Sequence, residues 1–164
     1  MLIIELGGLS IKIAFEVLEK MFHYIQNDNI KPEAGGILIG HDLQDHNFSI
    51  TDISIPTVYD KSSRFNFTRS KKNAQQILNK FFKESNGKKI YLGEWHTHPE
   101  DYPTPSLLDN KSILERMQRD VLNSEIIFMI IVGRKNFYIS FVKMDGIKNE
   151  KNINFKDIDY EFHL

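Results

Sequence analysis

The sequence of 164 residues contains no cysteine. Disulfide bonds, thiolate nucleophiles and cysteine-based zinc sites are therefore excluded, because each of them requires a thiol. Any metal ion must be held by histidine and carboxylate side chains. The search for a functional site is thereby narrowed to histidine, aspartate and glutamate.

The sequence also lacks a concentrated basic region and a long apolar run. The formal net charge is -1 and the basic residues are scattered, so we expect no nucleic-acid partner. The longest apolar stretch, residues 126–132, is far shorter than the roughly 20 residues of a membrane-spanning helix. Residues 1–5 have no basic flank and lack the form of a secretory signal. We therefore expect a cytoplasmic protein without a membrane segment.

What is present is the composition of an ordinary globular protein. Hydrophobic residues make up 41% of the chain and charged residues 26%. The length suits one domain with a sizeable core and is too short for two full domains. We predict that residues 1–164 form a single domain.

Hydrophobic periodicity in the first half predicts alternating helices and strands, and thus an α/β fold. After a short opening strand, Ser10 is expected to cap a helix. The apolar residues that share one face of this helix are Ile11, Ala14, Phe15, Leu18, Phe22 and Ile25. Residues 33–40 and 47–55 are predicted to form a hairpin, followed by a helix at 70–85 and a strand at 89–96.

The second half begins with an irregular segment, because residues 99–105 contain three prolines. A third helix is expected at 106–117, with Ser106 at or near its N-cap. Residues 126–133 and 137–144 are predicted to form a second hairpin. The tail at 151–164 carries spaced apolar residues that can add a further strand.

The strand that ends near residue 96 carries a candidate metal site. His96 and His98 are two residues apart, so in extended backbone both imidazoles lie on one face while Thr97 points away. Asp109, brought back by the proline-rich loop, can supply a third ligand. Glu94 shares the histidine face and is an alternative third ligand. Two imidazoles and one carboxylate leave one position of a tetrahedral Zn²⁺ open, which is typical of catalytic sites.

Two separate motifs in the chain match one known family. His96-Thr97-His98-Pro99, followed by Ser106-Leu107-Leu108-Asp109, meets the spacing H-x-H-x(7)-S-x-x-D and resembles the JAMM motif of JAB/MPN-domain zinc isopeptidases. About sixty residues upstream, the run from Glu33 to Gly40 fits the E-x-x-G-x-L-x-G pattern of the same family. The resemblance covers roughly residues 10–145.

The resemblance implies a fold and a role for each site residue. The fold is the cytidine-deaminase-like α/β architecture of MPN domains, a mixed, curved sheet flanked by helices with the metal site at one end of the strands. One Zn²⁺ per chain is implied on His96, His98 and Asp109, because Asp109 and not Glu94 fits the motif. By the same resemblance, Glu33 takes a proton from the attacking water and passes it to the leaving amine, and Ser106 hydrogen-bonds the oxyanion.

The implied function is cleavage of the C-terminal peptide or isopeptide bond of a ubiquitin-like or conjugated protein. The run from Gly93 to Glu100 is similar to bacterial stand-alone JAB proteins, which include deconjugases of a cyclic-nucleotide synthase in CBASS anti-phage operons. Three alternatives stay open: processing of a ThiS- or MoaD-like sulfur carrier, a non-catalytic MPN interaction scaffold, and a JAB protein linked to DNA processes. The oligomeric state is also open. Residues 64–67 and 100–105 are the candidate substrate contacts.

The remaining histidines and the glycines of residues 35–40 have simpler interpretations. His23, His41, His46 and His163 show no paired spacing, and we propose none of them as a ligand. The glycines are not followed by the Lys-Ser/Thr of a phosphate-binding loop. We expect them to mark close backbone approach within a packed sheet.

Overall fold

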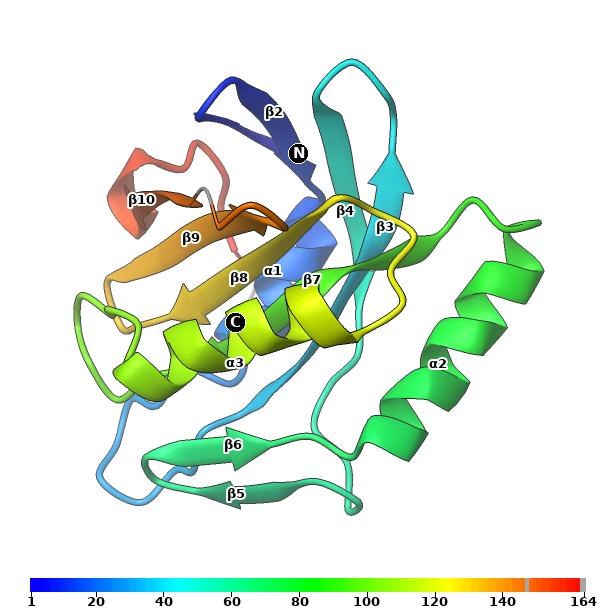
Figure 1. Cartoon of the computed structure of the whole chain (residues 1–164). Helices are drawn as coiled ribbons and strands as arrows, with labels where there is room; N and C mark the ends of the chain where they lie inside the picture. Colours follow the sequence, from blue (N-terminus) through cyan, green and yellow to red (C-terminus); the bar gives the residue numbers. More distant parts are fainter. Residues whose placement is uncertain (147, 163–164) are drawn as a thin grey trace.

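The computed structural model describes residues 1–146 and 148–162, and Figure 1 shows the arrangement of its elements. Eight strands form one sheet in the order β1-β2-β4-β3-β7-β8-β9-β10. These strands are β1 (Leu2–Leu6), β2 (Leu9–Ile13), β3 (Gly35–Asp42), β4 (Asn47–Ile53), β7 (Ile90–Thr97), β8 (Ile126–Val132), β9 (Asn136–Lys143) and β10 (Lys148–Asn154). The short strands β5 (Lys61–Ser63) and β6 (Asn66–Thr68) form a separate hairpin.

The helices α1 (Phe15–Phe22), α2 (Lys71–Glu84) and α3 (Leu107–Arg119) flank the sheet, and a short 3-10 helix, η1 (Phe155–Asp157), follows β10. Strands β2 and β4 pair in parallel, as do β7 and β8, whereas the other neighbouring pairs are antiparallel. The predicted mixed α/β sheet with flanking helices is confirmed.

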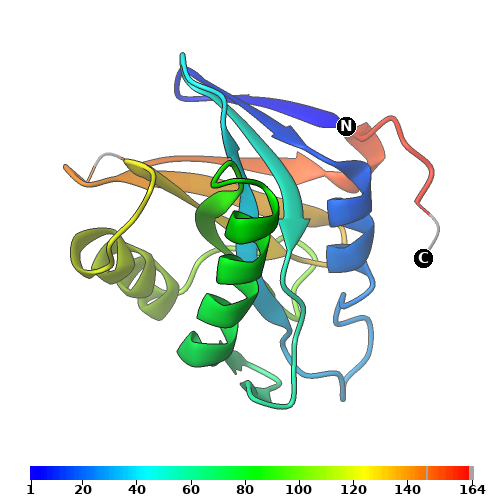
Figure 2. The same cartoon turned by 90° about the vertical axis from the view of Figure 1, so that its right-hand side faces the viewer.

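The two faces of the sheet have separate hydrophobic cores. Figure 2 shows α1 on one side of the sheet and α2 and α3 on the other. On the α1 side, Leu18 packs in a cluster with Trp95 and Phe128, all three nearly inaccessible to solvent. On the opposite side, Ala74 of α2 and Ile113 of α3 share a cluster with sheet residues. Strand β7 contributes to both cores, so its two faces are both buried.

The predicted helix from Ser10 is wrong at its start. Residues Leu9–Ile13 form β2, and α1 begins only at Phe15, with Ala14 as an N-cap that makes no side-chain hydrogen bond. Leu9, Ile11 and Ile13 are buried while the residues between them are less so, which is a strand period. Ser10 instead donates a hydrogen bond to the Glu5 carboxylate at 2.8 Å.

The other predicted elements agree with the structure within a few residues. Ser70 caps α2 by accepting a hydrogen bond from the Asn73 N–H at 3.2 Å, and Ser106 caps α3. The hairpin strands β3–β4 and β8–β9 pair as predicted. The predicted contact segment 64–67 lies in the β5–β6 hairpin, which was not predicted from the sequence.

The C-terminal tail adds a strand, but that strand begins before the predicted segment. β10 pairs with β9, and the aromatic residues beyond it return to α1. Tyr160 stacks on Phe15 with 4.0 Å between ring centroids. The predicted tail runs to residue 164. Its last two residues, His163 and Leu164, lie outside the described residues. Within the described ranges, no helix has the length and apolar character needed to cross a membrane.

Candidate metal centre and active site

The site lies where the end of β7 meets the start of β3. His96 is opposite Gly35 in the antiparallel register, and the Thr97 N–H donates to the Ala34 carbonyl at 2.8 Å. The predicted strand over 33–40 begins only at Gly35, so Glu33 precedes it. Its backbone N–H donates to the Ser63 carbonyl at 2.8 Å, which attaches Glu33 to the β5–β6 hairpin.

Gly35 permits the close approach of β3 and β7. A Cβ atom at this position would lie 2.5 Å from the Trp95 carbonyl oxygen and 2.7 Å from the Phe67 ring. Gly36 would meet the backbone of Ser54 in the same way. Close backbone approach within the sheet therefore explains these glycines, as predicted from the sequence.

Three potential metal ligands converge at this end of the sheet. The Nε2 atoms of His96 and His98 are 3.1 Å apart, and the Asp109 oxygens lie 3.4 Å from His96 Nε2 and 3.3 Å from His98 Nε2. Zinc bonds of about 2.0–2.1 Å in a tetrahedron place neighbouring ligands about 3.3 Å apart. The observed separations fit that requirement. These three residues are the candidate metal cluster among the residues that the structure describes.

Asp109 is held in place by the start of α3. Ser106 Oγ accepts from the Asp109 N–H at 3.0 Å, and Asp109 Oδ2 accepts from the Ser106 N–H at 2.7 Å, which is a capping box. Burial raises the pKa of Asp109, but hydrogen bonds and charge from His96 and His98, with the Ser106 N–H, outweigh it and bring the pKa well below its usual range. The carboxylate is therefore ionised and available as a ligand.

Glu33 lies beside the cluster and is not part of it. Its side chain is 6% exposed, and Oε1 is 3.9 Å from His98 Nε2. Burial raises the pKa of Glu33 to about 7, against the opposing attraction of His98. A carboxyl group with this pKa can both accept and release a proton near neutral pH.

The second nitrogen of His98 faces another carboxylate. His98 Nδ1 is buried without a hydrogen-bond partner, and Glu100 Oε1 is the nearby carboxylate oxygen, at 3.6 Å. Burial lowers the pKa of His98, but the hydrogen bond and charge of Asp109, with Glu33 and Glu100, give a net rise. A carboxylate beside the outer nitrogen of a metal-binding histidine orients the ring and increases its basicity.

Thr97, which was predicted to point away from the histidine face, belongs to a buried polar network. Its Oγ1 donates to Gln26 Oε1 at 3.0 Å and accepts from the Ala34 N–H at 3.0 Å. The Gln26 amide also donates to the carbonyls of Lys31 and Arg64, each at 3.0 Å. Gln26 is fully buried. It therefore connects the histidine strand to the Glu33 segment and to the β5–β6 hairpin.

Glu94, the alternative third ligand, is bound by cations instead. Arg69 donates three hydrogen bonds of 2.8–3.0 Å to its carboxylate, and Arg116 Nε lies 3.3 Å away. The Tyr91 hydroxyl donates to the same carboxylate at 2.8 Å. The sequence did not predict these two arginines, because only the fold brings Arg116 of α3 and Arg69, two residues before α2, to β7.

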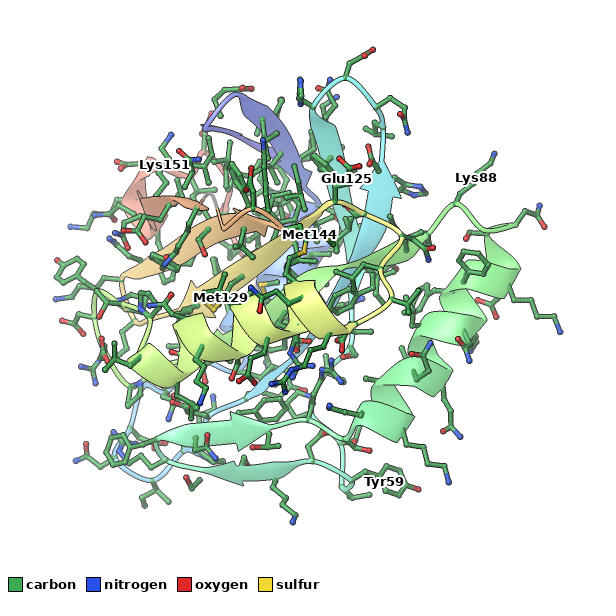
Figure 3. All side chains as sticks on the ribbon, in the orientation of Figure 1. Tyr59, Lys88, Glu125, Met129, Met144 and Lys151 are labelled. Atoms are coloured by element: carbon green, nitrogen blue, oxygen red, sulfur yellow. The ribbon has the colours of Figure 1, made fainter. Side chains whose placement is uncertain are left out.

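The candidate metal ligands line a cavity of about 370 Å³, together with Glu33, Ser106, Glu94, Arg69 and Arg116. Phe65 and Phe67, which belong to the predicted contact segment 64–67, border the cavity. From the second predicted segment, residues 100–105, Glu100 contributes to the lining. Met129 also lines the cavity, and Figure 3 shows it on β8 where α3 crosses the sheet.

A mixed sheet with a His-x-His pair at the end of a central strand, and an aspartate in the first turn of the next helix, is the arrangement expected of a JAB domain. The family model for prokaryotic homologues of the JAB domain matches residues 16–145. The chain belongs to this family. The family predicted from the two sequence motifs is thus confirmed.

Individual relatives agree with this assignment, and a solved structure shares the fold alone. The chain is 40% identical over 139 residues to a CD-NTase/cGAS isopeptidase of Escherichia coli (strain TW11681), covering 85% of this chain and 86% of the relative. A protein of the same name from Vibrio cholerae is 37% identical over 123 residues, covering 75% and 76%. The solution structure of protein DSY2949 from Desulfitobacterium hafniense shares the fold, with a TM-score of 0.59, 18% identity and coverage of 93% and 95%.

Proposed function

We propose that this chain is a zinc-dependent isopeptidase that releases a cyclic-nucleotide synthase of the CD-NTase type from a protein conjugate, as part of CBASS anti-phage defence. The relatives called CD-NTase/cGAS isopeptidase support the reaction and its protein substrate, because they align over three quarters or more of their length. The observation that carries the proposal is the 3.1–3.4 Å cluster of His96, His98 and Asp109 beside a buried Glu33. In this proposal residues 1–164 form one domain with one zinc ion.

His96, His98 and Asp109 would hold the zinc, and their two imidazoles and one carboxylate are ligands that zinc accepts. When bound, zinc supplies Lewis acidity, which polarises the scissile carbonyl and lowers the pKa of water. The Ser106 capping box and the Ala34–Thr97 backbone pairing keep the ligands at this separation. Rigid support of this kind reduces the rearrangement needed when metal binds.

Glu33 would act as the proton carrier. Its carboxylate lies 3.9 Å from His98 Nε2 and faces the same cavity. In the ionised form it accepts a proton from the attacking water, and in the protonated form it donates that proton to the leaving nitrogen. The second step matters because an amine leaves readily only after protonation.

Ser106 would stabilise negative charge on the carbonyl oxygen. Its Oγ accepts the capping hydrogen bond from the Asp109 N–H, so the hydroxyl proton stays available for donation. Ser106 also lines the cavity. One serine can therefore cap α3 and donate to an oxyanion at the same time.

The non-catalytic scaffold is disfavoured because the ligand set and the adjoining glutamate are all in place. Processing of a sulfur carrier would use the same site and differs only in substrate. The DNA-linked alternative has no support from a net charge of -1.

The proposal is tested with a conjugate in which the C-terminus of a CD-NTase is joined to another protein. Protein carrying one zinc per chain is expected to release the CD-NTase with an unmodified C-terminal carboxylate, as measured by intact mass, while chelated protein releases none. A ThiS- or MoaD-like fusion serves as the alternative substrate. Absence of cleavage by the zinc-loaded protein, or cleavage of the fusion alone, would overturn the proposal.

A further inference from the structure

A second cavity, of about 440 Å³, adjoins the catalytic one and lies between α2 and the C-terminal half of α3. Arg69 and Arg116 line both cavities, so the two are neighbours across these side chains. Figure 1 shows β6 leading toward α2 beneath α3. We name the second space the α2–α3 cavity.

The α2–α3 cavity has an excess of positive charge. Arg69, Lys71, Arg116 and Arg119 line it, whereas its lining includes one acidic residue, Asp120. Arg119 also has an exposed ion pair with Glu115 at 3.8 Å, which is a weak interaction. An anion is therefore the complementary ligand for this cavity.

The excess of positive charge includes two guanidinium groups that are partly buried. The side chains of Arg69 and Arg116 are 11% and 23% exposed, and they share the single carboxylate of Glu94. Two guanidinium groups around one carboxylate leave one positive charge without a partner of its own, in a place where water screens it weakly. A second carboxylate would balance the charges and could accept paired hydrogen bonds, as guanidinium groups favour.

We propose that the α2–α3 cavity is a specificity subsite for an aspartate or glutamate side chain in the tail of the protein substrate. This inference rests on the proposed function, since it takes the tail to enter the adjoining catalytic cavity. The acidic residue lies on the acyl side of the scissile bond. On the other side, an isopeptide bond offers a lysine side chain attached to a folded protein, which a cavity of about 440 Å³ cannot admit.

The position of the acidic residue follows from the length of α3. Asp109 precedes Arg116 by seven residues and Arg119 by ten, which corresponds to roughly 10–15 Å at about 1.5 Å per residue. An extended chain covers about 3.3 Å per residue. The acidic side chain is thus the third to the fifth residue before the scissile bond.

The test measures binding, so that it does not depend on catalysis. The probes are fluorescent nonapeptides that are identical except for Glu or Gln at the third, fourth or fifth residue from the C-terminus. The protein is the zinc-loaded full chain. For at least one of the three positions, we expect the Glu peptide to bind about tenfold more tightly than its Gln partner, which matches a charged hydrogen bond at the lower end of its usual strength.

Variants locate the effect in the cavity. Lys71→Gln and Arg119→Gln change exposed side chains at its rim, so the fold is expected to tolerate them, and each should reduce the preference for Glu at least threefold. Lys80→Gln is the matched control, because Lys80 is an exposed cation on α2 that does not line the cavity. It should leave the preference unchanged.

Equal affinity for the Glu and Gln peptides at all three positions would overturn the subsite. A preference that survives both rim variants, or that Lys80→Gln reduces equally, would overturn it as well. The proposed function fails separately, through absence of conjugate cleavage, and a Glu preference measured in that case would still support the anionic subsite.

Discussion

The Nε2 atoms of His96 and His98 lie 3.1 Å apart and both face the carboxylate of Asp109. The two rings come from one strand end, where alternate residues share a face, and the carboxylate comes from a helix start that is fixed by a capping box. Three groups of this kind at one point are best explained by a shared cation.

Metal removal is expected to lower stability. If zinc binds only the folded chain, a free concentration 1,000 times the dissociation constant adds about 4.1 kcal/mol. For a protein of this size, that corresponds to a melting temperature on the order of 10 °C higher. Differential scanning fluorimetry with zinc and with a chelator measures the difference. His96→Ala should abolish the difference in melting temperature between the zinc and chelator samples. His23→Ala is the control and should retain this difference, because His23 is an exposed residue at the C-cap of α1.

Replacing Glu33 by Gln is expected to stabilise the metal-free protein at high pH. The pKa of Glu33 in the folded state, about 7, lies above its ordinary value of 4.5, so ionisation of this buried group opposes folding. The cost is present in full above pH 7 and is lost as the pH falls toward 4.5. Glu33→Gln should thus add about 3 kcal/mol at pH 8 and less than about 1 kcal/mol at pH 5.

Urea unfolding of chelated protein at the two pH values measures this effect. Glu125→Gln is the control, because Glu125 is exposed and its substitution should change stability little at either pH. If Glu33→Gln raised the free energy of unfolding equally at pH 5 and pH 8, burial of the ionised Glu33 carboxylate would not be the cause of the gain in stability.

The two roles of Ser106 can be separated by substitution. Alanine removes both the cap and the hydroxyl donor and should cost about 1 kcal/mol, whereas glycine at an N-cap costs only a few tenths. Both variants lack the oxyanion donor and should lose cleavage by about 10²- to 10³-fold. Measurement of unfolding and of single-turnover cleavage distinguishes the roles. If Ser106→Gly cleaved at the wild-type rate, Ser106 would be a cap alone.

The network of Thr97 and Gln26 is expected to position the histidine strand relative to Glu33. Thr97→Val keeps the shape of the side chain but removes the hydrogen bonds that Thr97 Oγ1 makes with Gln26 Oε1 and the Ala34 N–H. Each buried group that loses its partner should lower the free energy of unfolding by about 1–3 kcal/mol. We expect lower stability and a lower kcat with little change in KM, while Thr97→Ser should preserve most of both. A kcat equal to wild type in Thr97→Val would show that the network serves stability alone.

The sequence was sufficient to predict that His96, His98 and Asp109 converge, but not to predict the start of the fold. The period of two places His96 and His98 on one face, and the motif spacing places Asp109 in the first turn of α3, as the structure shows. By contrast, Ile11 belongs to a helical spacing with Phe15 and Leu18 and also to a strand alternation with Leu9 and Ile13. Residues 9–13 form a strand because β2 pairs with both β1 and β4.

The surroundings of Glu94 could not be predicted because they depend on tertiary packing. Arg69 and Arg116 are 25 and 22 residues away in the chain, and no local pattern links either to β7. The same is true of Gln26, which is 71 residues from Thr97. A glutamine in the segment that follows α1 gives no sequence signal of a buried network.

The role of Glu33 as the proton carrier is measured by single-turnover cleavage of the CD-NTase conjugate with zinc-loaded Glu33→Gln protein. Zinc content is measured on the same sample, because loss of metal would itself abolish cleavage. We expect one zinc per chain and a rate at least about 10²-fold below wild type, as for loss of a general base. One zinc per chain with a wild-type rate would contradict this role.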